Sequence, residues 1–245
     1  NEGIQLASLC VCVSLSLSLC LSLFLCFSLS LRCDMSAVEP HKPGAAVVLY
    51  WRRWWMLFLQ AFGNACNAFM WISFAPVQAQ SKGFYSTSDF WINVLSIVYM
   101  VVSFPLLFVA GWVQDRTKKG LWLTIMIGAI LNLVGAWVRY ASSFGNIYWV
   151  ALVGQTIAGS SQPFYLICAP KLAAEWFPVY QRTVATTIAS LSNVLGIMLG
   201  FLLPPILIES SNPEFQPLLL YSAVASSVAS VLTVFTFQGS PPTPA

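Results

Sequence analysis

The sequence is poor in charged residues and in histidine. Of its 245 residues, 8% are Asp, Glu, Lys or Arg and one is histidine, whereas 58% are hydrophobic and 14% are aromatic. Soluble domains carry about a quarter charged residues, so most of the charge of a soluble protein is missing. This composition excludes a disordered chain, a nucleic-acid-binding protein that contacts phosphates through basic patches, and an ordinary cytosolic enzyme.

The seven cysteines do not form a disulfide pattern. Five lie in one N-terminal tract, and Cys66 and Cys168 lie in apolar runs. The sequence also lacks a nucleophile–base pair, a His/Cys cluster with metal-binding spacing and a phosphate-binding glycine loop. We therefore expect an integral membrane protein that is not an enzyme and holds no metal and no cofactor.

Long charge-free gaps define six predicted membrane helices. A bilayer core of about 30 Å needs about 20 apolar residues of helix, and each gap is long enough. The predicted helices are 54–77, 90–112, 121–140, 147–170, 183–208 and 218–237. We expect an all-α integral membrane bundle, with residues 35–53 before the first helix and residues 238–245 at the start of the next loop.

Residues 3–31 are also uncharged, but their pattern differs from that of the predicted helices. Leu and Ser alternate with a period of two rather than 3.6, and the tract has neither the basic segment nor the cleavage site of a signal peptide. We interpret residues 1–34 as translated untranslated sequence, with Met35 as the true start. The alternative is a genuine additional membrane anchor.

Lysine and arginine are distributed unequally between the two sides of the predicted bundle. Two of them, Lys82 and Arg139, fall on one side and eight on the other. Because basic residues favour cytoplasmic loops, we expect both termini in the cytoplasm, in the plasma membrane or an organelle membrane. The eight basic residues are Lys42, Arg52, Arg53, Arg116, Lys118, Lys119, Lys171 and Arg182.

The loop after the second predicted helix contains the run Gly111-Trp112-Val113-Gln114-Asp115-Arg116-Thr117-Lys118-Lys119. It resembles the G-x-x-x-D-R-x-G-R/K-R/K signature of the major facilitator superfamily, which occupies the same loop. It departs from that pattern where Lys118 replaces the second glycine and Gly120 the last basic residue. The resemblance implies a gating latch formed by Gly111, Asp115, Arg116, Lys118 and Lys119. The plainer alternative is a positively charged loop that contains an aspartate.

The resemblance also implies a fold, the six-helix N-terminal half of a carrier made of two inverted three-helix repeats. Phe74-Ala75-Pro76 ends the first predicted helix and Cys168-Ala169-Pro170 ends the fourth, 94 positions later. Because such a carrier binds substrate between two halves, we expect this chain to need a second six-helix half as its partner.

The fifth predicted helix carries Gly196 and Gly200, four residues apart. This spacing is typical of close helix packing. A rocking contact between two halves is the alternative.

Further short runs resemble the feline leukaemia virus subgroup C receptor-related transporters, a haem- and choline-transporter-like family. They include Asn67-Ala68-Phe69-Met70-Trp71 and Gly154-Gln155 with Gln162, and the likeness extends from about Arg53 to the C-terminus. In the studied members of that family, the tryptophan of the first run and the second glutamine contact a choline-like substrate. The resemblance implies the same role for Trp71 and Gln162.

Polar side chains within the predicted helices are candidates for a substrate site. Asn67 and Trp71 share a face of the first helix, and Gln155 and Gln162 share a face of the fourth. An aromatic ring attracts a quaternary ammonium, and a glutamine carbonyl can orient a hydroxyl. The alternative is that these residues only pack or bridge helices. The candidate substrate-binding residues are Trp71, Gln162, Asn67, Gln155 and Tyr99.

The functional prediction is a facilitative transporter of a small organic cation such as choline or ethanolamine. No Asp, Glu, His, Lys or Arg lies near the middle of a predicted helix, which disfavours proton coupling. Haem transport is an alternative, although the single histidine, His41, precedes the first helix and haem iron is usually held by His, Cys, Met or Tyr. A non-transporting membrane receptor or assembly subunit is the alternative from another class.

Overall fold

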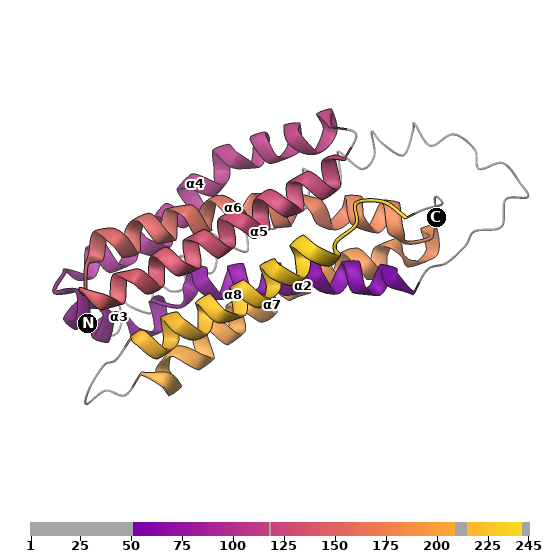
Figure 1. The fold of residues 1–245 in the computed structure, drawn as a ribbon. Coiled ribbons are helices and arrows are strands. Elements are labelled where there is room, and N and C mark those ends of the chain that lie inside the picture. The colour runs from indigo at the N-terminus through magenta and orange to yellow at the C-terminus, as the bar shows by residue number, and fades with distance from the viewer. Residues whose placement is uncertain (1–50, 118, 209–214, 242–245) are drawn as a thin grey trace, which may run out of the picture. The chain divides into compact units, whose positions relative to one another are not determined.

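A computed structural model describes residues 51–117, 119–208 and 215–241. The predictions for residues 1–34 and 35–50, for Lys118 and for residues 242–245 lie outside these ranges. Within them every regular element is helical, and six long helices confirm the predicted all-α bundle (Figure 1). The elements are α2 (Arg52–Ile72), η2 (Ala75–Val77), α3 (Gln78–Tyr85), α4 (Asp89–Arg116), α5 (Gly120–Ala141), η3 (Ser142–Phe144), α6 (Tyr148–Trp176), α7 (Val179–Leu207) and α8 (Gln216–Thr236).

The first membrane helix is shorter than the predicted 54–77. α2 ends at Ile72, and the chain continues through the short 3-10 turn η2, with Pro76 near its start, into α3. Proline has no N–H to donate to the preceding turn and disfavours a helical residue before it. The α-helix is therefore interrupted shortly before Pro76, and a short surface helix precedes α4.

The fourth helix is longer than the predicted 147–170, because α6 continues through Pro170 to Trp176. An internal proline leaves the carbonyl four residues earlier without its helical donor, and neighbouring helices can supply one. At Pro163 that carbonyl belongs to Gly159, and it accepts a hydrogen bond of 2.8 Å from the Ser103 hydroxyl of α4. Lys171 consequently lies in helix rather than in the loop where the sequence pattern placed it.

The contacts between helices follow the expected repeat pattern. α2 packs mainly against α7, and α6 packs against α4 and α5. If α2, α4 and α5 form one repeat and α6, α7 and α8 the other, the first helix of each repeat packs on the second helix of the other. These two contacts fit inverted repeats, although α6 packs most extensively on α5, the third helix of the first repeat.

Polarity varies between the helices. Four of them, α4, α5, α7 and α8, are long and apolar enough to cross a membrane by length and composition. α2 and α6 are more polar and bury amide side chains such as Asn67 and Gln155. A polar side chain is tolerated at membrane depth when it faces other helices rather than lipid. The polar residues therefore concentrate where α2 and α6 meet their neighbours.

The glycine pair of α7 packs against α2. A Cβ atom at Gly196 would lie 2.3 Å from the Ala65 carbonyl oxygen, and one at Gly200 would lie 2.4 Å from Ile72. Only glycine allows the two backbones to approach so closely. The two glycines thus allow α7 to pack closely against α2 within the bundle.

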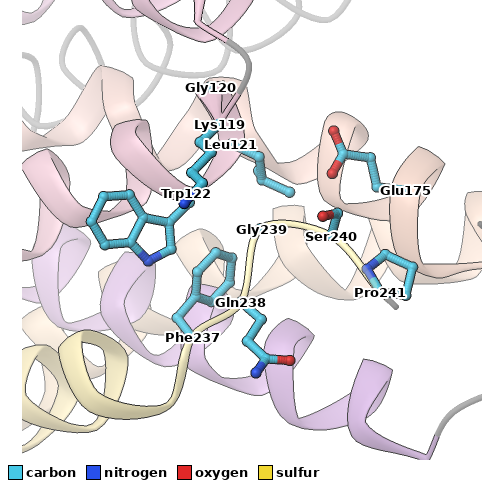
Figure 2. A pocket seen from close by; sticks show the side chains of 10 residues that line it. All are labelled: Lys119, Gly120, Leu121, Trp122, Glu175, Phe237, Gln238, Gly239, Ser240 and Pro241. Atoms are coloured by element: carbon cyan, nitrogen blue, oxygen red, sulfur yellow. The ribbon is translucent and has the colours of Figure 1, made fainter. Parts of the chain in front are cut away.

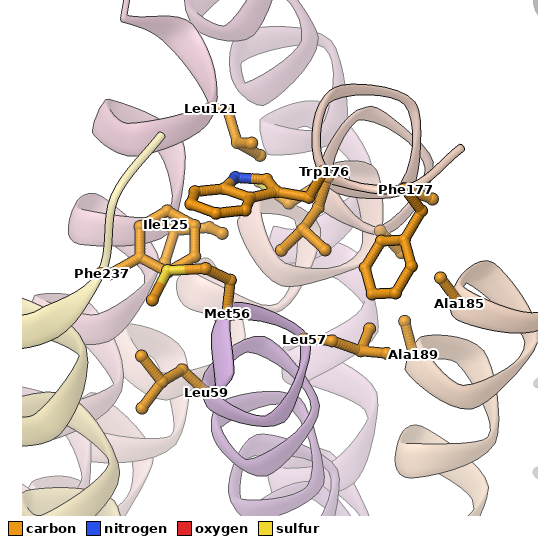
Figure 3. Packing of buried hydrophobic residues seen from close by; sticks show 14 of the residues in the cluster. Met56, Leu57, Leu59, Leu121, Ile125, Trp176, Phe177, Ala185, Ala189 and Phe237 are labelled. Atoms are coloured by element: carbon orange, nitrogen blue, oxygen red, sulfur yellow. The ribbon is translucent and has the colours of Figure 1, made fainter. Parts of the chain in front are cut away.

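Apolar clusters close the two ends of the bundle. At the end where α4 and α6 finish and α5 and α7 begin, here called the basic end, Trp176, Phe177 and Phe237 pack around Met56 and Leu57 (Figure 3). At the opposite end, an aromatic cluster gathers Phe74, Tyr85, Tyr148 and Phe215. A third, smaller cluster around Trp71 and Tyr99 holds the middle, where the candidate site lies.

Candidate substrate-binding site

One face of α2 carries a row of buried polar residues. Gln60, Asn64, Asn67 and Trp71 are spaced three or four apart, so they point the same way, and each is less than 5% exposed. Gln60 Nε2 donates to the Tyr165 carbonyl at 3.0 Å, and Asn64 Nδ2 donates to the Ser192 hydroxyl at 3.1 Å. These two bonds fix α2 against α6 and α7.

Asn67 joins three helices. Its Nδ2 lies 2.9 Å from Asn132 Oδ1 on α5, and 2.9 Å and 2.6 Å from the Ala158 carbonyl and the Ser161 hydroxyl on α6. Its own carbonyl accepts a 3.0 Å bond from the Tyr99 hydroxyl on α4. A buried amide with partners on several helices stabilises one arrangement of the bundle.

Trp71 is packed rather than open. Its side chain is 4% exposed, and the indole N–H donates to the Ser96 carbonyl of α4 at 3.1 Å. The Trp71 carbonyl accepts a 3.2 Å bond from Gln155 Nε2. The ring therefore occupies the α2–α4–α6 contact, with protein covering its faces in this conformation.

Gln162 joins the same cluster through a serine that sequence analysis did not list among the site residues. The Ser103 hydroxyl lies 2.6 Å from the Tyr99 carbonyl and 3.1 Å from Gln162 Oε1. Gln162 is partly exposed, whereas Tyr99 and Gln155 are fully buried. The five predicted residues thus form two hydrogen-bonded groups, Trp71 with Gln155, and Asn67 with Tyr99 and, through Ser103, Gln162. Trp71 and Tyr99 pack in the same cluster, which brings the two groups together. Gln162 is the accessible member.

Arg139 is a buried cation beside this cluster. The sequence pattern counted it with the charges of one side, at the end of the predicted helix 121–140. In the structure it lies in the last turn of α5, and its side chain is fully buried. Its Nη2 donates to the Ser73 hydroxyl at 2.7 Å, and its guanidinium lies 4.9 Å from the centre of the Phe74 ring. Ala136 lies three residues before Arg139, so the two share a face of α5, and both are fully buried. This spacing is the signal by which the sequence could have indicated that Arg139 is buried.

Tyr85 of α3 lies close to this arginine and hydrogen-bonds to the Ser142 hydroxyl at 2.9 Å. Burial raises the pKa of the Tyr85 hydroxyl above its ordinary value, and the bond to Ser142 and the charge of Arg139 partly offset this. Tyr85 is therefore neutral at physiological pH.

The predicted latch lies at the basic end. Among the described residues, Asp115 pairs with Lys171 of α6 rather than with Arg116 or Lys119 beside it; its carboxylate lies 3.8 Å from Lys171 Nζ and is largely exposed. Lys171 makes a shorter contact, a 2.7 Å hydrogen bond to the carbonyl of buried Gln114. Gln114 was missed by the sequence analysis, although it lies within the motif.

The other residues of the predicted latch differ in their packing and exposure. Gly111 faces Ile167, which lies 3.3 Å from the position of a Cβ atom there, so α4 and α6 approach closely. Arg116 is exposed. Lys119 lines the pocket at this end, and Lys118 lies outside the described ranges.

A pocket of about 490 Å³ opens at the basic end (Figure 2). It is bounded by residues 119–122, by Glu175 and by residues 237–241, which cross below the start of α5. The Trp176 indole holds this segment by a 3.3 Å bond to the Gly239 carbonyl. None of the five candidate substrate residues lines the pocket, so it is separate from the Trp71 cluster.

The sequence is similar to a family of known membrane transport proteins. Residues 57–245 match the family model described as Major Facilitator Superfamily. The chain is 34% identical over 202 residues to the choline/ethanolamine transporter flvcr2a of Danio rerio, covering 80% of this chain and 43% of that protein.

Two further relatives show the same extent of likeness. The choline/ethanolamine transporter FLVCR1 of Felis catus is 34% identical over 209 residues, 82% of this chain and 37% of the relative. Solute carrier family 49 member A3 of Xenopus tropicalis is 33% identical over 204 residues, 80% and 42% respectively. The chain thus spans less than half the length of each of these relatives.

Proposed function

Because this chain belongs to the Major Facilitator Superfamily, we propose that it forms the N-terminal half of a facilitative carrier for a small organic cation such as choline or ethanolamine. The observation that carries the proposal is that Trp71 and Tyr99 pack together in the middle of the bundle, with Gln155 bonded to the Trp71 carbonyl and with Asn67 and Gln162 joined to Tyr99. Two of the similar proteins are named choline/ethanolamine transporters, which supports this choice of substrate.

In the proposed mechanism, the indole of Trp71 attracts the ammonium through its ring quadrupole, and the Gln162 carbonyl orients the hydroxyl or amine of the substrate. Gln162 is partly exposed and first meets the substrate, whereas the Trp71 ring is covered. Access to the ring requires α4 to separate from α2, which breaks the bond from the Trp71 indole to Ser96. Rocking of one half against the other would supply that movement, so a second six-helix half belongs to the proposal.

The same proposal covers orientation and coupling. The basic end, with Arg116, Lys119 and Lys171, faces the cytoplasm, as the distribution of basic residues favours. Of the Asp, Glu, His, Lys and Arg residues in the described helices, Arg139 is buried near the site, and a guanidinium does not release its proton in a protein. This favours passive transport or exchange over proton symport.

The test is uptake of labelled choline and ethanolamine by cells that express the full-length gene product. Replacing Trp71 with Ala removes the aromatic face, and we expect uptake to fall by about tenfold or more, since a desolvated cation–π contact contributes about 2 kcal/mol. Trp71→Phe should retain part of the activity. Trp112→Ala is the matched control, because Trp112 is 62% exposed and outside the cluster.

Surface abundance of each variant is measured alongside uptake. Equal uptake by wild type and Trp71→Ala would refute the aromatic site. Loss of haem transport on Trp71→Ala with intact choline uptake would favour the haem alternative. A surface-exposed wild-type protein that moves neither choline nor ethanolamine nor haem would favour the receptor or assembly role.

A further inference from the structure

Arg139 carries a charge that no acidic side chain of the described ranges balances. Of the three acidic residues in those ranges, Asp89 pairs with Lys82 at 2.9 Å, and Asp115 pairs with Lys171 at the basic end. Glu175 lines the basic-end pocket. Burying a charged side chain without a counterion is unfavourable, so the charge points to a partner that is not part of the described chain.

The guanidinium retains unused hydrogen-bond donors. Nη2 bonds to Ser73, whereas Nε and Nη1 are buried and have no acceptor among the described residues. The stem of the side chain packs directly on Gly154 of α6, since a Cβ atom there would lie 2.7 Å from Arg139 Cγ. In this packed position two of the three guanidinium nitrogens lack an acceptor among the described residues.

The arginine lies next to the proposed ammonium site. Ser73, its acceptor, is two residues after Trp71, and Ala136, three residues or about 4.5 Å before Arg139 along α5, packs in the cluster of Trp71 and Tyr99. The next residue after Gly154 is Gln155, which holds the Trp71 carbonyl and whose own Oε1 has no described donor. The guanidinium therefore lies near the edge of the Trp71 cluster, with Phe74 as its own aromatic contact.

This pairing has an electrostatic consequence. A positive charge near the Trp71 cluster opposes the entry of a substrate that is only cationic. The opposition disappears if an anionic group arrives with the ammonium, because a carboxylate, phosphate or halide accepts hydrogen bonds from a guanidinium strongly.

We infer that Arg139 is an anion-binding residue and that the carrier takes its ammonium substrate together with a negative charge. The charge is either an anionic group on the same molecule, as in a trimethylammonium carboxylate, or a separate small anion such as chloride. This inference rests on the proposed function for the ammonium half of the site. The anion site itself rests on the burial and the open donors of Arg139.

The experiment measures competition against labelled choline by trimethylammonium carboxylates with increasing spacing between the two charges, in chloride and in gluconate medium. The full-length gene product is compared with Arg139→Gln, which removes the charge, and with Arg139→Lys, which keeps it. Lys82→Gln is the matched control, because Lys82 is an exposed cation at the same end of the bundle.

If the anion is part of the substrate, one carboxylate of the series inhibits at lower concentration than choline. Arg139→Gln then weakens that inhibitor by about tenfold or more, because a hydrogen bond to a charged group contributes about this much. Inhibition by choline is not weakened, because choline carries no group that Arg139 attracts. If the anion is separate, choline uptake falls in gluconate medium, and Arg139→Gln abolishes that dependence. In both cases Arg139→Lys and Lys82→Gln retain the wild-type behaviour.

A wild type with neither carboxylate preference nor chloride dependence overturns the inference, even if Arg139→Gln fails to reach the membrane. An Arg139→Gln variant that keeps the carboxylate preference or the chloride dependence of the wild type also overturns the inference. An equal loss in Glu209→Gln or Glu214→Gln would assign the role to an internal ion pair and likewise overturn it. If the wild type transports no choline, the proposed function fails, and thermal stabilisation of the purified protein by the carboxylates or chloride, lost in Arg139→Gln, tests the anion site independently.

Discussion

At the residue scale, the centre of the bundle depends on side chains that satisfy one another across helices. Asn67 contacts α5 and α6 and accepts from α4, and the Trp71 indole donates to α4. Leaving a buried polar group without a hydrogen bond destabilises the fold by more than a satisfied hydrogen bond stabilises it. Each of these residues therefore constrains the position of its partners. A substrate that enters must replace the contacts that it breaks.

Ser73 offers a direct measure of this dependence. Its hydroxyl is the hydrogen-bond acceptor of the Arg139 side chain in the described part of the chain. Ser73→Ala should lower the free energy of unfolding by about 1–3 kcal/mol, because it leaves a buried charged donor without that partner. Thermal unfolding of the purified protein measures the loss. Ser143→Ala is the control, since the Ser143 hydroxyl bonds to the nearby Tyr140 carbonyl, three residues earlier; an equal loss there would contradict the argument.

The sequence allowed part of this site to be predicted. Spacing of three and four placed Asn67 and Trp71 on one face of a helix, and the structure brings both together with Tyr99 and Gln155. Arg139 was assigned to the loop charges because it follows a long apolar segment, which hydropathy treats as the end of a span. Its burial depends on which way the last turn of α5 faces and on Gly154 opposite, and neither is visible in charge-free gaps.

At the element scale, helix ends determine which residues can meet. The predicted end of the fourth helix at residue 170 separated Lys171 from the helix, since proline usually marks a boundary. In the structure α6 continues to Trp176, and this extra turn carries Lys171 to the end of α4. The sequence predicted the number and type of the helices, but not how tertiary contacts extend one helix past a proline and stop another before one.

The connection between α4 and α6 gives the second prediction. Lys171 donates to the Gln114 carbonyl at 2.7 Å, whereas its contact with Asp115 is 3.8 Å and exposed. Lys171→Met should reduce the free energy of unfolding by about 1 kcal/mol. The variant loses a hydrogen bond from a charged group, and the partial exposure of that group to solvent weakens the contribution. Asp115→Asn should change it by less than about 0.5 kcal/mol, because exposed ion pairs contribute little. Denaturation midpoints in detergent measure both, and a larger effect of Asp115→Asn would restore the charge-pair latch inferred from the motif.

At the scale of the whole molecule, the outer surface of the bundle is strongly apolar. Large apolar side chains on α4 and α7, among them Phe104, Phe108 and Leu191, are more than half exposed. In a membrane such surface is covered by lipid or by other helices. Since a carrier of this superfamily binds substrate between two halves, some of this surface is expected to face the second half.

The orientation of the bundle is testable with single cysteines. Gly83 lies in the surface helix α3 with nothing within 4 Å of a Cβ atom, and Arg116 is exposed at the basic end. Because basic residues favour the cytoplasmic side, a membrane-impermeant maleimide should label Gly83→Cys in intact cells and Arg116→Cys only after permeabilisation. The background is the full-length gene product with its native cysteines replaced by serine. Labelling of Arg116→Cys from outside would show the opposite orientation. Labelling of both positions from the same side would show that α4, which lies between them, does not cross the membrane.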